Sequence, residues 1–165
     1  MVILGIDPGL AIVGWGVVEY VKGKFRVLGY GSIRTEAGLP TEQRLALIYR
    51  DLNHVIDYFK PDEIAVEELF FNTNITTGIR VAEARGIILL CAAQKGLPFS
   101  EYTPLQVKSA VVGYGRAEKR QVIAMVTDIL GLAEPPKPDD TADALAIAVC
   151  HAHSGASRIA KYFNN

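Results

Sequence analysis

The stretch "VILGIDPG", residues 2–9, begins with an apolar run and ends on an aspartate that is followed by Pro-Gly. The run is typical of a strand that is buried on both faces. Asp7, its last residue, has two explanations. It forms a turn together with Pro8 and Gly9, because Asp, Pro and Gly are common turn residues, or it is a charge held at a strand end to bind something. The rest of the chain has to decide between them.

The segments that follow alternate between strand and helix patterns. Residues 12–20 and 24–33 are rich in β-forming residues and predict a hairpin. Further strands are expected within 63–70 and 97–103. The predicted helices cover residues 41–59, with Thr41 as N-cap, then 72–95, 118–130 and 139 to about 153. Without an internal repeat or a linker, residues 1–165 predict a single α/β domain, a mixed five-stranded sheet flanked by helices.

The composition is apolar for a chain of this size. Hydrophobic residues make up 50% and the mean hydropathy is +0.20, which suggests an apolar surface that a partner covers. No apolar run approaches the roughly 18 residues of a membrane span, and the N-terminus lacks the features of a signal peptide. Cys91 and Cys150 lie in apolar helical stretches and are expected to be buried thiols, so we expect a cytoplasmic protein.

Charge is distributed unevenly along the chain, although the net charge is only −1. Residues 72–121 hold seven Lys or Arg and three Asp or Glu, whereas acidic residues are in excess on both sides. This basic middle fits two interpretations. It is either an ordinary solvated surface or a surface for a polyanion beside a carboxylate site.

Besides Asp7, acidic residues interrupt two other apolar elements. Glu67 lies in "IAVEELF", and Asp140 and Asp143 lie in "DDTADALAIA" at 139–148. A spacing of three places the two aspartates on one helix face, with roughly 5–6 Å between their Cβ atoms. Each residue alone also has a structural explanation: Glu67 faces solvent, and Asp139 or Asp140 caps the helix. Asp143 is harder to explain in this way, because the apolar face follows it.

As a set, these carboxylates indicate a metal site. Several carboxylates in one cleft repel one another and raise one another's pKa unless a cation is present, and Mg²⁺ is a hard cation that prefers oxygen ligands. No cysteine and histidine cluster competes for a softer metal. His151 and His153 are two apart, point in different directions on a helix, and are interpreted as structural. Neither a P-loop nor a serine-hydrolase motif occurs in the sequence.

A carboxylate site for two Mg²⁺ ions is typical of hydrolytic attack on a phosphodiester. One ion would activate water, and the other would stabilise the leaving oxygen. In this interpretation Asp7 ends its strand because a rigid strand holds a metal ligand in place, and Pro-Gly turns the chain away from the ion.

Several segments resemble the successive motifs of one known family: "ILGIDPG", "AVEELFFNTN", "ARG" at 84–86, "PLQVKSAVVGYGRAEKRQV" at 104–122 and "DDTADALAIA". In this order and spacing the chain resembles, over nearly its whole length, the RuvC crossover-junction endodeoxyribonucleases, the bacterial Holliday junction resolvases. The resemblance implies a ribonuclease H-like fold and a homodimer that cuts two strands of a four-way DNA junction symmetrically with Mg²⁺, in recombination and repair. Mn²⁺ is expected to substitute, and a branch-migration motor complex is an expected partner.

The resemblance places the four catalytic carboxylates on Asp7, Glu67, Asp140 and Asp143. Asp139 is an additional acidic residue beside the pair. Both the spacing to Asp143 and the resemblance favour Asp140 over Asp139 as the ligand.

The resemblance also implies DNA contacts. An aromatic residue just after the catalytic glutamate falls on Phe70, and the lysines that flank the glycine-containing loop fall on Lys108 and Lys119. Arg116 lies in that loop and suits a phosphate contact. An exposed Phe70 would stack on unpaired bases, although ordinary core packing is its alternative.

The second predicted helix is the expected dimer surface. It carries small residues that allow close approach and apolar residues that add area: Gly78, Ala82, Gly86, Ala93, Ile79, Ile87, Leu90 and Cys91. A twofold dimer would place one active site on each of two strands. The alternative is that this helix is simply central in its own domain.

Two other functions were weighed. "GIDPG" also resembles the first phosphate motif of actin-like ATPases and sugar kinases, which share the same sheet. Those proteins need two such domains around the nucleotide, and 165 residues are too few, so this chain would be a fragment. A non-catalytic junction-binding relative is the second alternative, and the four carboxylates argue against it.

Overall fold

The computed structural model describes the backbone of residues 1–69 and 75–163 and the side chains of residues 1–69 and 76–155. Two predictions therefore lie outside the described residues. These are the exposure of Phe70 and the start of the second helix at Asn72.

The described strands form one mixed sheet in the order β3-β2-β1-β4-β5. Their bounds are Val2–Asp7 for β1, Ile12–Val21 for β2, Lys24–Arg34 for β3, Glu63–Glu67 for β4 and Phe99–Tyr102 for β5. β1, β2 and β3 are antiparallel neighbours, whereas β4 runs parallel to β1 and to β5. The predicted hairpin is confirmed. Lys22 and Gly23 form its two-residue turn, both with positive φ, as hairpin twist favours.

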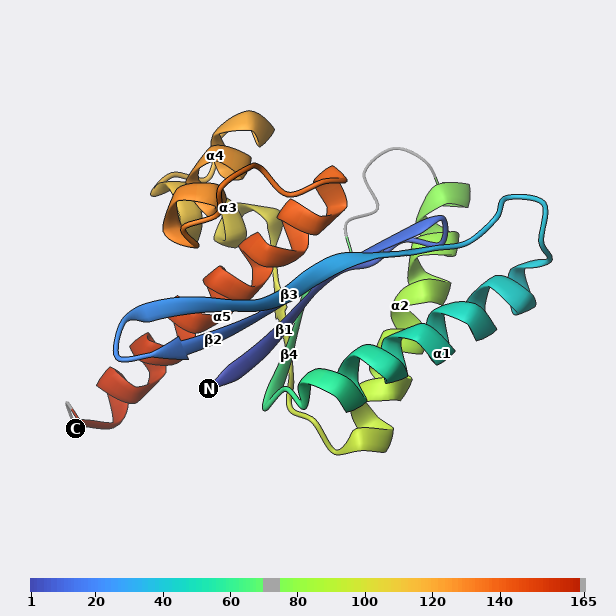
Figure 1. Ribbon diagram of the computed structural model, residues 1–165, viewed down its shortest axis with the longest axis horizontal. Helices are drawn as coiled ribbons and strands as arrows, with labels where there is room; N and C mark the ends of the chain where they lie inside the picture. Colours follow the sequence, from blue (N-terminus) through green and yellow to red (C-terminus); the bar gives the residue numbers. More distant parts are fainter. Residues whose placement is uncertain (70–74, 164–165) are drawn as a thin grey trace.

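Helices cover both faces of this sheet (Figure 1). α1 and α2 pack on one face and α3, α4 and α5 on the other, so that the sheet separates two apolar cores. The bounds are Thr41–Phe59 for α1, Ile75–Lys95 for α2, Pro104–Val112 for α3, Lys119–Ile129 for α4 and Asp139–Phe163 for α5. The predicted α/β architecture with its mixed five-stranded sheet is confirmed.

Three details differ from the sequence predictions. Helix α3 was not predicted. It forms because Thr103 and Gln106 make a capping box around Pro104 at its first turn. The N-cap of α1 is Pro40 rather than Thr41, and no side chain caps that end. Helix α5 continues beyond the predicted end near residue 153.

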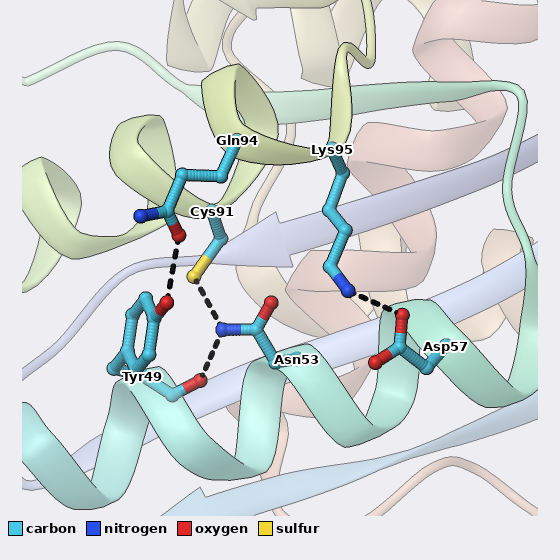
Figure 2. A network of polar contacts seen from close by, with 6 residues as sticks. All are labelled: Tyr49, Asn53, Asp57, Cys91, Gln94 and Lys95. Atoms are coloured by element: carbon cyan, nitrogen blue, oxygen red, sulfur yellow. Dashed lines mark hydrogen bonds and ion pairs between the residues drawn. The ribbon is translucent and has the colours of Figure 1, made fainter.

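A polar network fixes α2 against α1 (Figure 2). The Tyr49 hydroxyl donates to Gln94 Oε1 at 2.7 Å, and Asn53 Nδ2 lies 3.4 Å from the sulfur of Cys91. Lys95 pairs with Asp57 one turn further along α1. The face of α2 that carries these residues therefore packs against α1 of the same chain.

Both cysteines are buried and unpaired, as predicted. Burial raises the pKa of each thiol to about 11, so both remain protonated and unreactive at neutral pH. None of the described helices combines the length and apolar character that crossing a bilayer requires.

Candidate active site

Asp7 and Glu67 lie side by side because they end neighbouring parallel strands. Ile6 of β1 is in register with Val66 of β4, so the following residue on each strand reaches the same edge of the sheet. The next strand ends there too, since Glu67 is in register with Tyr102 of β5. Parallel pairing thus converts two distant acidic residues into a pair at one edge.

The first turn of α5 reaches this edge because the helix lies directly on the backbone of β1 and β2. A Cβ atom on Gly5 would overlap the carbonyl oxygen of Ala144, and one on Gly14 would overlap the carbonyl oxygen of Asp140. Gly14 is also the register partner of Asp7. Glycine in the strands therefore allows the close approach that brings the acidic end of α5 to Asp7.

The pKa values show that the four predicted carboxylates act on one another. The pKa of Asp7 is raised from 3.8 to about 8, most of all by burial and then by the negative charges of Asp143, Glu67 and Asp140. The pKa of Glu67 is raised by burial and by Asp143, and that of Asp143 by burial, by Asp140 and by Asp139. The structure thus brings together all four of these residues.

Two predicted lysines face the same carboxylates. Lys119 and Lys108 line a cavity of about 180 Å³ together with Glu67 and Asp143. Lys119 Nζ donates to Asp143 Oδ2 at 2.9 Å. Burial lowers the pKa of Lys119, but this hydrogen bond and the charge of Asp143 outweigh burial and raise it overall. The lysine therefore stays positively charged beside the acids.

Asp139 and Asp140 differ in their surroundings. The Asp139 side chain is 62% exposed and lies 3.7 Å from Lys119 Nζ. Asp140 is half-buried, packs against Gly14 and contributes to the raised pKa of Asp7, whereas Asp139 does not. These surroundings favour Asp140 as the member of the acidic set.

The donor set fits a hard divalent cation. Its four members offer carboxylate oxygens, which Mg²⁺ and Mn²⁺ prefer, and the raised pKa values of Asp7, Glu67 and Asp143 mark an excess of negative charge that a cation would relieve. Within the described residues, no three acidic, histidine or cysteine side chains already stand at ligand spacing around one point.

The other predicted contacts are less closely placed. Arg116 is exposed in the loop between α3 and α4 and does not line the cavity of Glu67 and Lys119. His151 is buried between the Tyr102 hydroxyl, 2.8 Å from its Nδ1, and Glu63, 2.7 Å from its Nε2. This placement agrees with its interpretation as a structural residue.

The sequence analysis missed Arg44, which is buried beside the acidic edge. A signal was present. Arg44 precedes Ile48, Leu52 and Ile56 at intervals of four and so falls on the buried stripe of α1.

Comparisons with known proteins show which family and fold the chain resembles. Residues 3–151 match the family described as Crossover junction endodeoxyribonuclease RuvC. A crossover junction endodeoxyribonuclease RuvC of Alkaliphilus metalliredigens is 58% identical over 155 residues, 94% of each chain. The structure of Thermus thermophilus RuvC in complex with a Holliday junction substrate superposes with a TM-score of 0.89, at 40% identity over 94% of each chain. The yeast mitochondrial Holliday junction resolvase Ydc2, at 16% identity and a TM-score of 0.66 over 98% of this chain and 83% of its own, shares the fold.

Proposed function

The chain belongs to the RuvC family of crossover junction endodeoxyribonucleases, and from this premise we propose that its acidic edge hydrolyses the strands of a Holliday junction. The cuts are paired and symmetric and serve homologous recombination and DNA repair. The observation that carries the proposal is the convergence of Asp7, Glu67, Asp140 and Asp143, whose charges act on one another. Residues 1–165 act as a single nuclease domain.

We propose Mg²⁺ as the cation, with two ions in each site and Mn²⁺ as a substitute. Asp7, Glu67, Asp140 and Asp143 would hold it, because they are the carboxylates that reach the shared edge. When bound, such ions lower the pKa of a water that attacks the phosphodiester and stabilise the charge on the leaving oxygen. The pKa of Asp7, raised to about 8 by burial and by the neighbouring carboxylates, favours its protonated form, and cation binding would release this proton.

The lysines and the loop after α3 carry positive charges that favour binding of the DNA backbone. Lys108 and Lys119 hold positive charge in the cavity that Glu67 and Asp143 share, where they attract a phosphodiester. Arg116 is exposed and available to a phosphate further along the strand. Phe70 would stack on unpaired bases at the junction, and this part of the proposal rests on the sequence alone.

The dimer surface is narrower than the sequence suggested. Cys91 is fully buried and does not belong to an outer face, whereas Ile87 packs on the protein's own core and remains partly exposed. Ile79 is 51% and Leu90 46% exposed, and a Cβ atom on Gly86 would meet nothing within 4 Å. The exposed Ile79 and Leu90 on this open face of α2 support an isologous dimer contact. A branch-migration motor complex is proposed as a further partner on family membership alone.

A labelled four-way junction incubated with the wild-type protein tests the function. With Mg²⁺ we expect nicks at matched positions on two strands of like polarity, and no nicks on a linear duplex of the same sequence. Junction binding without any nick would support a non-catalytic relative. Hydrolysis of ATP in place of DNA cleavage would support the actin-like alternative.

A further inference from the structure

A second cavity opens beside the acidic edge, on the face of the sheet that α1 and α2 cover. It has a volume of about 360 Å³, within the usual range for ligand sites. It is lined by the β1–β2 loop, the N-terminal parts of α1 and α2 and one carboxylate. The lining residues are Gly9, Leu10, Ala11, Ile12, Arg44, Thr77, Arg80, Val81 and Asp140. We call it the Arg44 cavity.

Arg44 is unusual because this buried cation has no acidic partner in the part of the chain that the structure describes. Arg44 is only 7% exposed. Arg44 Nε donates to Thr35 Oγ1 at 2.8 Å, and that hydroxyl donates to the carbonyl of Leu10. No carboxylate of the described residues lies within ion-pair distance of Arg44. Buried charges are normally paired, so this one calls for an anion.

The remaining donors of Arg44 face the cavity. Its terminal Nη groups have no hydrogen-bond partner among the described residues. Among those residues, Arg85 Nε is the only fully buried side-chain nitrogen or oxygen without a partner, so the Nη groups of Arg44 are not fully buried. They therefore reach the surface of the cavity that Arg44 lines. Thr35 holds the guanidinium by its Nε edge, which leaves the Nη edge free for an incoming group.

The rest of the lining specifies a phosphate group. Arg80 is exposed at the cavity and makes no ion pair within the described part of the chain. Two guanidinium groups with free N–H donors match the oxygens of a phosphate, which arginine binds through paired hydrogen bonds. Asp140 forms one wall, so the cavity adjoins the acidic edge and a group bound there lies close to the site of cleavage.

We propose that the Arg44 cavity binds a backbone phosphate of the strand that is cut, flanking the scissile linkage, with Arg44 as its main donor and Arg80 at its rim. This inference rests on the proposed nuclease function, because it takes the DNA strand as the ligand. The contact positions the strand and performs no chemistry. It would fix which linkage lies over the carboxylates.

Binding of a four-way junction in Ca²⁺ tests the inference without cleavage. We expect Arg44→Met to weaken binding by about tenfold and to reduce the steepness of log K against log salt by about 0.9, the value for one phosphate contact. Arg80→Ala, on the exposed rim, should also weaken binding and reduce the steepness of log K against log salt. The matched control is Arg50→Ala, on the same helix but outside the cavity and already paired with Asp51, and it should match wild type.

A junction with one methylphosphonate linkage, which lacks the phosphate charge, locates the contact. At one position near the cut, the neutral linkage should weaken wild-type binding but have little further effect on Arg44→Met. If every position weakens both proteins equally, or if Arg44→Met and Arg80→Ala keep the wild-type salt dependence, the cavity does not bind the strand. If Arg44→Met does not fold, Arg80→Ala provides the same comparison of affinity and salt dependence.

The outcomes also separate the inference from the function on which it rests. Wild-type protein that binds junctions with this coupling but never cuts them in Mg²⁺ would overturn the nuclease proposal and leave the Arg44 cavity supported. Wild-type protein that cuts while both arginine variants bind normally would overturn the cavity alone.

Discussion

The carbonyl oxygen of Asp140 occupies the space that a Cβ atom on Gly14 would need. Because Gly14 is in register with Asp7, this contact sets how closely the acidic end of α5 approaches the end of β1. The spacing of the carboxylates thus depends on a strand residue that has no side chain.

Replacing Gly14 should therefore move the acidic end of α5. We expect Gly14→Ala to lower the free energy of unfolding by about 1–3 kcal/mol through overpacking and to reduce cleavage by about 100-fold through misplaced carboxylates. Chemical denaturation and junction cleavage measure the two effects. Gly38→Ala is the control, because nothing lies within 4 Å of a Cβ atom there. Normal cleavage by Gly14→Ala would show that this contact does not position the site.

The raised pKa of Asp7 predicts a pH-dependent stability. A folded-state pKa of about 8 against an ordinary value of 3.8 means that the folded chain binds this proton more tightly than the unfolded chain. Stability contributed by Asp7 is therefore present below about pH 4 and decreases as pH rises toward 8. Thermal unfolding in EDTA should show that the stability of Asp7→Asn relative to wild type increases as pH rises across this range.

Addition of Mg²⁺ at pH 8 should make wild type more stable than Asp7→Asn, the reverse of the result expected in EDTA. A cation that binds the folded state stabilises wild type by mass action, whereas Asp7→Asn has lost one ligand charge and should respond less. A difference in stability between the two proteins that does not vary with pH would contradict the burial of an ionisable Asp7 among like charges.

The choice of metal should separate binding from turnover. We expect Mg²⁺ and Mn²⁺ to support cleavage, whereas Ca²⁺ should support junction binding without turnover, because it is larger and takes looser coordination. Gel shifts and cleavage assays on the same labelled junction measure both steps. Robust cleavage in EDTA would exclude a metal mechanism.

The exposed face of α2 predicts the assembly. Leu90→Glu should yield folded monomers that bind junctions less tightly and lose coordinated paired cuts, because a charge opposes an apolar contact between copies. Sedimentation at micromolar concentration measures the change. Val21 is a similarly exposed apolar residue at the hairpin turn. The control variant Val21→Glu should therefore remain dimeric. Wild type that sediments as a monomer while cutting symmetrically would show that this surface is not an interface.

Much of the site was predictable because its positions depend on local patterns. Asp7 ends an apolar run, Glu67 sits within another, and Asp140 and Asp143 are three apart at a helix start. Their convergence also required parallel pairing of β1 with β4, which agrees with the predicted α/β sheet.

Other features depend on tertiary contacts that no local pattern contains. Helix α3 has only nine residues, and its capping box around Thr103 was not recognised. The Arg44 cavity is assembled from the β1–β2 loop, α1, α2 and α5, so only the folded chain shows that Arg44 has no acidic partner among the described residues. The role of Phe70 stays a prediction.

The most direct test of the central claim compares wild type with Asp7→Asn on a labelled four-way junction in Mg²⁺. The variant should bind as tightly as wild type or slightly more tightly, because one negative charge near phosphate is gone. Its cleavage rate should fall by about 10²–10³-fold, the loss of several kcal/mol of transition-state stabilisation. Junction cleavage by Asp7→Asn at close to the wild-type rate would contradict the assignment of this acidic edge as the active site.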